Sequence, residues 1–513
     1  MQRFLDRHKD RILGVLCGFD RVLFRGTLRM ISHLRGMNMF LSHHSILYKD
    51  FGKFAERVSE RVKTHAKQYA DREGRPYVYV RSPKCSKEDI ATEIRDRDGI
   101  KDGLICVLAC VEPCRSFALR KDPKRKHLVL EPAFRQCLFL YFYYLDREFG
   151  LMHVRLQTWL PLDIQVCLNG REYLAHRMDR AGIGYEQRDN CFVRIDDVSR
   201  AQRMLDDLYQ RDWSRFLSRL AHRVNPWLGR AGGLSLDQYY WSIRESEVAT
   251  DVMFRSEEDL AAIYPALVSH AIQQFNSEKV MRFLGRRTNS RFNGEVVSDV
   301  THRSEGIRVK HRVEENSIKM YDKQGSVLRI ETTINNPRRF KVRRRVTRRG
   351  QSTRQWVPLR KGVADITRRA EICRAANERY LEALGVVGEP SPTRHLLDPV
   401  SKRIVRDGRP YRALRPIEPE EARLFQALLD GKFLLQGFHN RDIRRVLYPA
   451  VESNSAQRRQ ASGRVTRLVR LLRAHGLIQK VSHTLYYRVT NRGQHVMTTA
   501  LRLREIDIAA LAA

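Results

Sequence analysis

Between residues 306 and 349 the chain contains three short runs in which every second side chain is apolar and those between are polar. A period of two is typical of β-strands that bury one face. The turn-forming sequence Asp322-Lys323-Gln324-Gly325 separates the second run from the third and predicts a hairpin. The apolar positions expected to face a core are Ile307, Val309, Val313, Ile318, Met320, Leu328, Ile330 and Ile334.

Pairing of the second and third runs would place Lys319, Tyr321, Arg329 and Glu331 together on the opposite face of the sheet. A phenol, a carboxylate and two cations, followed by an arginine-rich segment, favour a site that handles phosphate groups. The alternative is an ordinary solvated face, on which cross-strand ion pairs need no function.

The string K-x-Y-D-K that begins at Lys319, followed by L-R-I-E ending at Glu331, resembles the core of replication initiators of rolling-circle plasmids and filamentous phages. The resemblance extends over about residues 317–333. It implies that Tyr321 nicks one DNA strand, that Glu331 is a metal ligand or base, and that Lys319 and Arg329 stabilise the charge of the phosphorane. It also implies Mg²⁺ or Mn²⁺ as the cofactor of such a nuclease.

The metal ligands themselves are not identified from the sequence. Many of these initiators use a His-apolar-His strand, and the nearest counterpart in this chain is His153–Gln157, which offers one histidine. Glu245, Glu247 and Asp251 could hold a metal, or they could flank a surface helix without any function.

The overall charge narrows the class of partner. The 513 residues include 95 Lys and Arg against 59 Asp and Glu, for a net charge of +36. Such an excess predicts a polyanionic partner, and nucleic acid is the most common one. No apolar run of membrane-spanning length and no signal-peptide pattern occurs, so we expect a cytoplasmic protein without a membrane partner. The nine cysteines fit reduced thiols, with Cys106, Cys110 and Cys114 buried in a strand.

The sequence pattern of the chain before its C-terminal region predicts a mixed α/β fold with an antiparallel sheet. Helical spacing runs from Ser45 to about Arg72, and a β-α-β pattern follows, with strands at Tyr77–Val80 and Leu104–Val111. The aromatic-rich segment Phe134–Phe149 is expected to form a buried helix, and Gln238–Phe254 a surface helix. A single long helix is expected from Ser199 to about Val224.

The densest cationic segment, residues 338–349, is predicted to contact phosphates without sequence preference. Such a run is also typical of a solvated linker or a targeting patch. The arginines that carry this prediction are Arg343, Arg344, Arg345, Arg348 and Arg349.

The last 95 residues or so give the clearest fold prediction. A proline-rich linker, Pro390–Pro419, leads to a helix, a second helix capped by Asn440, a third with arginines on its outer face, and a two-stranded ribbon. This order resembles the winged helix-turn-helix of transcriptional regulators, over about residues 419–499. In that family the third helix enters the major groove of DNA. The residues that the resemblance implies in DNA contact are Arg464, Thr466, Arg467 and Arg470.

These patterns predict an α+β, multi-domain protein whose regions span residues 1–130, 131–336, 337–417 and 418–513. The first functional hypothesis is a DNA-binding protein of replication or mobile-element type, with duplex DNA as partner. If the protein nicks DNA, Tyr321 is the expected nucleophile. The protein could act as a homodimer. The alternatives are a non-enzymatic transcriptional regulator or architectural DNA-binding protein, and an RNA-binding partner of a structured RNA.

Overall fold

A computed structural model describes residues 1–122, 127–229, 232–234, 236, 238–286, 294–303, 306–348, 351–387, 393–430, 433, 437–451, 455–481 and 484–505. The chain divides into two compact units, which are described separately below. The first consists of Met1–Tyr264 with Phe283–Gly385, and the second of Pro265–Arg282 with Val386–Ala513. Within the described residues, no helix combines the length and the apolar character needed to cross a membrane.

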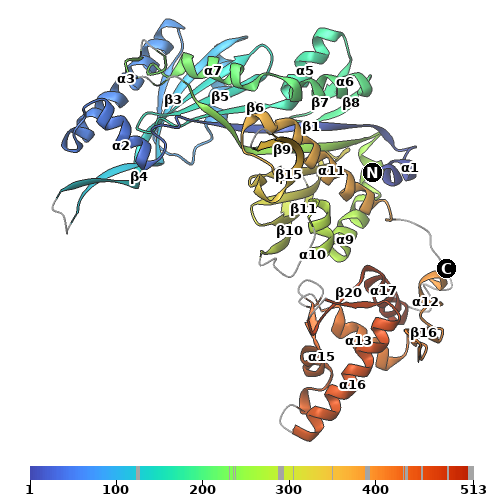
Figure 1. Cartoon of the computed structure of the whole chain (residues 1–513). Helices are drawn as coiled ribbons and strands as arrows, with labels where there is room; N and C mark the ends of the chain where they lie inside the picture. The colour runs from blue at the N-terminus through green and yellow to red at the C-terminus, as the bar shows by residue number, and fades with distance from the viewer. Residues whose placement is uncertain are drawn as a thin grey trace. The chain divides into compact units, whose positions relative to one another are not determined.

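An eleven-stranded mixed sheet organises the first unit (Figure 1). Its spatial order is β10-β11-β12-β13-β9-β1-β6-β5-β4-β3-β2, and only β2 and β3 are parallel neighbours. The strands are β1 Ile12–Thr27, β2 Tyr77–Val80, β3 Gly103–Lys121, β4 Leu128–Asp146, β5 Gly150–Gln157, β6 Ile164–Asn169, β9 Tyr240–Phe254, β10 Val296–Arg303, β11 Gly306–Val313, β12 Asn316–Lys323 and β13 Val327–Ile334.

Helices cover both faces of this sheet. Asn377 of α11 reaches Thr332 and Thr250 on one face, whereas α5 covers the opposite face at β1. The short strands β7 (Tyr185–Gln187) and β8 (Phe192–Ile195) form a separate pair. The helices are α1 Gln2–Arg7, α2 Leu34–His43, α3 Phe51–Arg72, α4 Lys87–Arg97, α5 Gly170–Ala181, α6 Val198–Asp206, α7 Trp213–Val224, α8 Glu257–Ala261 and α11 Ile366–Leu384.

The predicted β-α-β pattern is confirmed. α3 begins at Phe51 and ends at Arg72, and the Ser86 hydroxyl accepts a hydrogen bond from the backbone amide of Asp89 at the start of α4. β2 and β3 then pair in parallel. The expected burial of the β3 cysteines is also confirmed, since Cys106, Cys110 and Cys114 are at most 4% exposed. The expected boundary at residue 130 falls inside β4, so the regions on either side of it share one sheet.

Two of the expected helices are strands. Phe134–Phe149 belongs mostly to β4, and Gln238–Phe254 to β9. Six consecutive residues of β4, from Phe139 to Tyr144, are at most 8% exposed, because both faces of the strand are covered. A strand buried on both faces loses its alternation, and its sequence then resembles that of a buried helix.

The helix expected between Ser199 and Val224 is interrupted. α6 ends at Asp206, a short 3₁₀ turn spans Asp207–Gln210, and α7 starts at Trp213. The side chain of Asp212 accepts a hydrogen bond from the backbone amide of Arg215 and so caps α7. This N-cap is a helix start signal within a continuous helical pattern.

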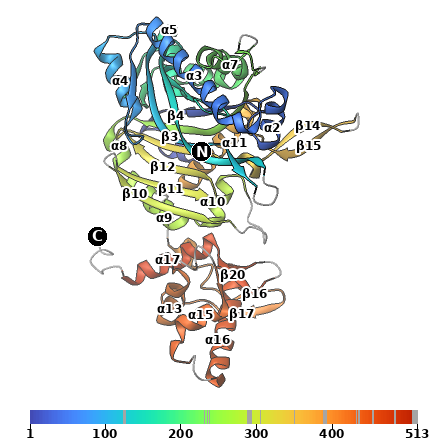
Figure 2. The same cartoon turned by 90° about the vertical axis from the view of Figure 1, so that its left-hand side faces the viewer.

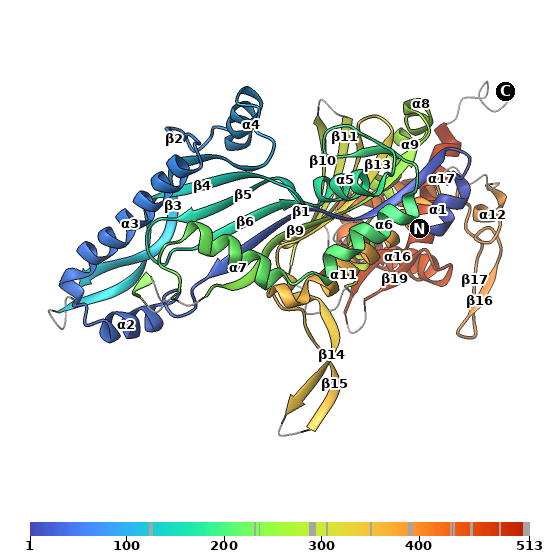
Figure 3. The same ribbon diagram turned by 90° about the horizontal axis from the view of Figure 1, so that it is seen from above.

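The three strands predicted between residues 306 and 334 are confirmed as β11, β12 and β13. The turn lies slightly later than expected, because Asp322 and Lys323 end β12. Gln324 and Gly325 instead form the bend with φ values of 56° and 75°. The following basic segment forms a two-stranded ribbon, β14 (Lys341–Arg348) with β15 (Gln351–Pro358), which projects from the first unit (Figures 2 and 3).

The second unit contains helices around a small sheet in the order β18-β20-β19. Its core includes Phe425, Ile443, Val465, Leu472 and Val496. The elements are α9 Tyr264–Gln274, α10 Ser277–Phe283, α12 Arg394–Leu397, β16 Ile404–Arg406, β17 Arg409–Tyr411, α13 Pro419–Leu428, β18 Phe438–His439, α15 Asn440–Leu447, α16 Ser455–Ala474, β19 Ile478–Lys480, β20 Tyr486–Val489 and α17 Asn491–Glu505.

Two details of the C-terminal prediction change. The segment expected to be a linker carries α12 and the β16–β17 hairpin, and its Val400 and Leu414 are buried in the core of this unit. The N-cap of α15 is His439 rather than Asn440, in a capping box with Asp442. The linker prediction failed because prolines mark breaks between elements without saying whether the segment packs.

Candidate nucleic-acid interface

The structure brings together the four residues predicted on one face of the central sheet. Lys319 lies opposite Glu331, and Tyr321 lies opposite Arg329, in the β12–β13 register. Lys319 Nζ lies 2.5 Å from Glu331 Oε1, and the Tyr321 hydroxyl donates a hydrogen bond to Glu331 Oε2 at 2.8 Å. The predicted convergence of these side chains is therefore confirmed.

Part of this face is not solvated, in contrast to the simpler alternative. Arg329 is only 1% exposed and Glu331 only 3%. Arg329 donates bidentate hydrogen bonds to the Asp251 carboxylate, from Nε at 2.6 Å and from Nη2 at 2.9 Å. It also contacts Asp20 at 3.1 Å and donates to the backbone oxygen of Asn190.

Arg171, at the start of α5, completes this buried network. It is fully buried and lies 2.8 Å from Asp251 and 3.7 Å from Asp20. Burial opposes the charged form of Arg329, but the carboxylates of Asp20 and Asp251 raise its pKa above the ordinary value. Such a group of paired charges holds β1, β9, β13 and α5 in one arrangement, and sequence periodicity gave no signal for it.

A β-bulge explains how Asp20 reaches the network. In the β1–β9 pair, Phe19 lies opposite Val248 and Arg21 opposite Glu247, which leaves Asp20 as the extra residue. A bulge of this kind redirects a side chain without ending the strand. A second bulge leaves Arg244 of β9 without a Cα partner on β1.

The electrostatics at Tyr321 oppose its use as a nucleophile. Burial and the nearby Glu331 carboxylate raise the pKa of Tyr321 above its ordinary value. Burial also acts to raise the pKa of Glu331, but Lys319 and the hydrogen bond from Tyr321 outweigh it and lower that pKa. A general base works best when its pKa approaches that of the group it deprotonates, and here the two values move apart.

Lys319 also links Glu331 to a second carboxylate. Its ammonium group lies 3.5 Å from Glu247 Oε1. Burial and the charge of Glu331 raise the pKa of Glu247 to about 7. Glu247 lines a cavity of about 370 Å³ on the same sheet face, together with Arg21, Leu23, Glu112, Tyr141, His153, Arg155, Gln165, Cys167, Arg244 and Glu245.

The carboxylates near Tyr321 do not fit a divalent metal ion. Across the described ranges, no group of three or more His, Cys, Asp or Glu side chains has the arrangement of a metal site. Asp251, one of the three acids considered from the sequence, is occupied by Arg171 and Arg329. Glu247 and Glu331 are joined by Lys319. The Mg²⁺ or Mn²⁺ prediction therefore has no ligand set in this part of the chain.

The β14–β15 ribbon carries a different kind of charge. Arg343 lies opposite Trp356, and Arg345 opposite Arg354, on one face of the ribbon. All four side chains are exposed, and Trp356 is 65% exposed. Within the described residues the three arginines have no ion-pair partner. Like charges directly opposite each other destabilise a strand pair.

Of these three arginines, the sequence predicted Arg343 and Arg345 but not Arg354. The remaining predicted arginines of the segment are placed differently. Arg344 points to the base of the ribbon, where Nη2 lies 2.5 Å from Asp365. Arg348 is the last residue of β14, its side chain lies outside the described part, and Arg349 is not among the described residues. A cavity of about 500 Å³ at the base is lined by Val342, Arg343, Arg344, Arg345, Arg354, Ala364, Asp365 and Arg368.

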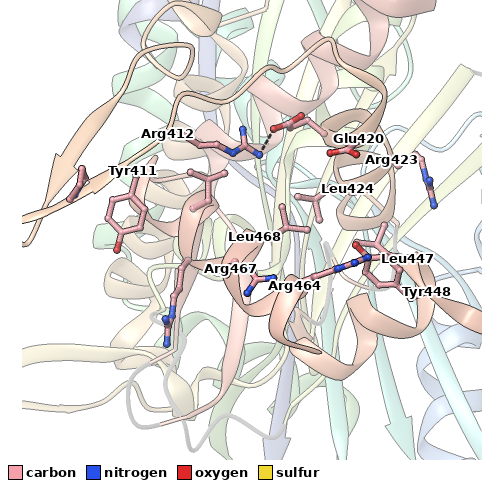
Figure 4. A pocket seen from close by; sticks show the side chains of 14 residues that line it. Tyr411, Arg412, Glu420, Arg423, Leu424, Leu447, Tyr448, Arg464, Arg467 and Leu468 are labelled. Carbon is pink, nitrogen blue, oxygen red and sulfur yellow. Dashed lines mark ion pairs between the residues drawn. The ribbon is translucent and has the colours of Figure 1, made fainter. Parts of the chain in front are cut away.

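The predicted arginine face of α16 is present in the second unit. Arg464, Arg467 and Arg470 are exposed, and they line a groove of about 810 Å³ (Figure 4). Thr466 is half-buried instead. Its hydroxyl donates to the backbone oxygen of Ser462 and accepts from Asn440, both at 2.8 Å, so it connects α15 with α16.

Comparisons of the chain with protein-family models, with curated proteins and with solved structures gave no match.

Proposed function

We propose that this protein binds double-stranded DNA, and that the β14–β15 ribbon contacts the phosphate backbone. The observation that carries the proposal is the ribbon face with Arg343, Arg345, Arg354 and Trp356, because its three cations have no partner in the described chain. Folding alone does not favour Arg345 opposite Arg354, and a polyanion between or beside them would offset their repulsion.

The exposure of the ribbon supports the same proposal. No residue of β15 is buried, and Val342 is the one buried residue among the described side chains of β14, so the ribbon adds little to any core. A two-stranded hairpin is marginally stable by itself. It is, however, of a size that the major groove of B-DNA admits. The deep and narrow major groove of A-form RNA does not admit side chains in this way, which favours DNA over duplex RNA.

The second unit supports a DNA partner through its order of elements. The helix and strand order expected from the winged-helix resemblance recurs in α13, α15, α16, β19 and β20. The short strand β18, which the sequence did not predict, lies between α13 and α15 in the chain. Arg464, Arg467 and Arg470 provide a second set of exposed cations on α16. A role in replication or in a mobile element, or as a regulator, stays a prediction based on resemblance.

The experiment that tests the proposal is titration of the full-length protein against a labelled 30-base-pair DNA duplex, an RNA duplex of the same sequence, and a neutral dextran. We expect DNA binding that weakens steeply between 50 and 200 mM salt. Equal affinity for the RNA duplex would contradict the choice of DNA. Absence of duplex binding at 50 mM salt would contradict the proposal as a whole.

Strand nicking has its own test. A supercoiled plasmid is incubated with Mg²⁺ or Mn²⁺ and either the wild-type protein or a Tyr321→Phe variant. The geometry of the Tyr321–Glu331 pair predicts no nicked circles with either protein. Nicked circles with protein attached to one DNA end, absent with the variant, would restore Tyr321 as a nucleophile.

A further inference from the structure

The groove beside α16 is concave, although a recognition helix must protrude to enter a DNA groove. One wall is α16 itself, with Arg464, Arg467 and Arg470. Residues of α13 and β17 and the end of α15 form the remaining walls. A helix enters the major groove of a duplex with a convex face. The arginine row is therefore better placed to hold a ligand that enters the groove of the protein beside α16.

The β16–β17 hairpin is fixed in place as a wall of this groove. Arg406 donates hydrogen bonds to the backbone oxygens of Arg473 and Ala474, at the end of α16. His475 contacts the backbone oxygen of Arg412 at 2.9 Å. The groove is thus a built feature of the second unit rather than a chance gap beside a linker.

The charge of the groove is strongly positive. Arg412 is paired with Glu421 at 2.8 Å. Among the described residues, the lining arginines Arg423, Arg464, Arg467 and Arg470 have no ion-pair partner, and Glu420 is the remaining lining acid. Four free guanidinium groups against one free carboxylate favour an anionic occupant.

The floor and ends of the groove are apolar and aromatic. Leu424, Leu468 and Leu471 line it, and Figure 4 shows Arg464 and Arg467 between Tyr411 and Tyr448. A duplex presents its phosphates outward and keeps its bases stacked inside. A single strand offers both a phosphate backbone and free base faces. Proteins that bind single strands combine a cationic groove with aromatic side chains for stacking.

We propose that the groove between α13, α16 and β17 binds a single strand of nucleic acid, with its phosphates on Arg464, Arg467 and Arg470 and its bases on the apolar floor. This inference rests on the proposed function and extends it. The protein would hold a duplex through the β14–β15 ribbon and an unpaired strand through the second unit. The volume of about 810 Å³ lies within the range of ligand sites and suits a few nucleotides.

The test uses full-length protein and fluorescence anisotropy with two probes, a labelled twelve-residue oligothymidylate and a labelled 30-base-pair duplex. The groove variant is Arg464→Gln with Arg467→Gln. Its matched control is Arg459→Gln with Arg473→Gln, which removes the same charge from exposed positions of the same helix that do not line the groove. Thermal unfolding of each variant checks that it is folded.

We expect the groove variant to lose at least tenfold in affinity for the oligothymidylate, and its matched control to lose less than threefold. Equal losses for the two variants would overturn the proposal, since charge alone would then explain binding. A wild-type protein that binds the duplex but not the single strand would overturn this inference and leave the proposed function intact. A wild-type protein that binds neither probe would contradict both.

Discussion

Two regions of the first unit are rich in arginine, and they differ in what their charges contact. In the central sheet, Arg171 and Arg329 are buried and lie against Asp20 and Asp251. On the β14–β15 ribbon, the arginines of one face are exposed and have no ion-pair partner in the described chain. The charges of the first arrangement are compensated inside the fold, and those of the second are available to a partner. Charge density alone does not distinguish them, because the distinction lies in pairing.

The largest expected effect concerns the buried network. Replacing Arg329 by Leu removes a positive charge that pairs with the buried carboxylates of Asp20 and Asp251. Removal of one partner from a buried ion pair costs about 3–5 kcal/mol. We expect the free energy of unfolding, measured by urea denaturation, to fall by this amount. The matched change on the ribbon, Arg343→Leu, is expected to alter stability by less than about 0.5 kcal/mol. Similar losses for both variants would remove the contrast between the regions.

A second prediction concerns pH and Glu247, which shares Lys319 with the central network. Its pKa is raised from 4.5 to about 7 in the folded protein, so the folded state holds the proton more tightly than the unfolded state. The binding of this proton contributes fully to the free energy of unfolding below pH 4.5. The contribution is lost as the pH rises from 4.5 to 7, at up to about 1.4 kcal/mol per pH unit.

The measurement for Glu247 is the free energy of unfolding of the wild type minus that of Glu247→Gln, from pH 4.5 to pH 8. The amide stays neutral throughout, so the difference should fall with rising pH and become constant above about pH 7. A difference that does not change with pH would mean that Glu247 has an ordinary pKa.

The smallest expected effect separates Thr466 from the arginines beside it. Thr466→Val removes the hydrogen bonds with Ser462 and Asn440 and should destabilise the protein by about 0.5–1.5 kcal/mol. Affinity for DNA should change little when measured at a temperature where the variant is fully folded. A loss of DNA affinity without loss of stability would instead support the contact with DNA that the sequence resemblance implies.

The sequence predicted those features that depend on local alternation and spacing. The three strands between residues 306 and 334, the convergence of Lys319, Tyr321, Arg329 and Glu331, and the exposed arginine row of α16 were all visible in this way. A hairpin fixes its own register, and a helix fixes which of its residues share a face. These relations extend over at most a few tens of residues.

The remaining features depend on contacts between distant segments. Asp20 and Arg329 are 309 positions apart, and a bulge in β1 brings them together, so no local pattern announces their contact. The strand β4 was mistaken for a helix because burial on both faces hides its alternation. Arg343 and Arg345 lie on the opposite face of the ribbon from Arg344. Their alternation along the chain predicts this, provided that the basic run is recognised as a strand rather than a linker.

The central claim is that unpaired cations on the ribbon contact DNA phosphates, and its most direct test is the salt dependence of binding. The ribbon variant is Arg343→Gln with Arg345→Gln and Arg354→Gln, and the control is Arg344→Gln, whose arginine is paired with Asp365. Each lost phosphate contact should reduce the slope of log affinity against log salt by about 0.9, so the ribbon variant should lose up to about 2.7. The control should keep the wild-type slope. A ribbon variant with an unchanged slope would contradict the account.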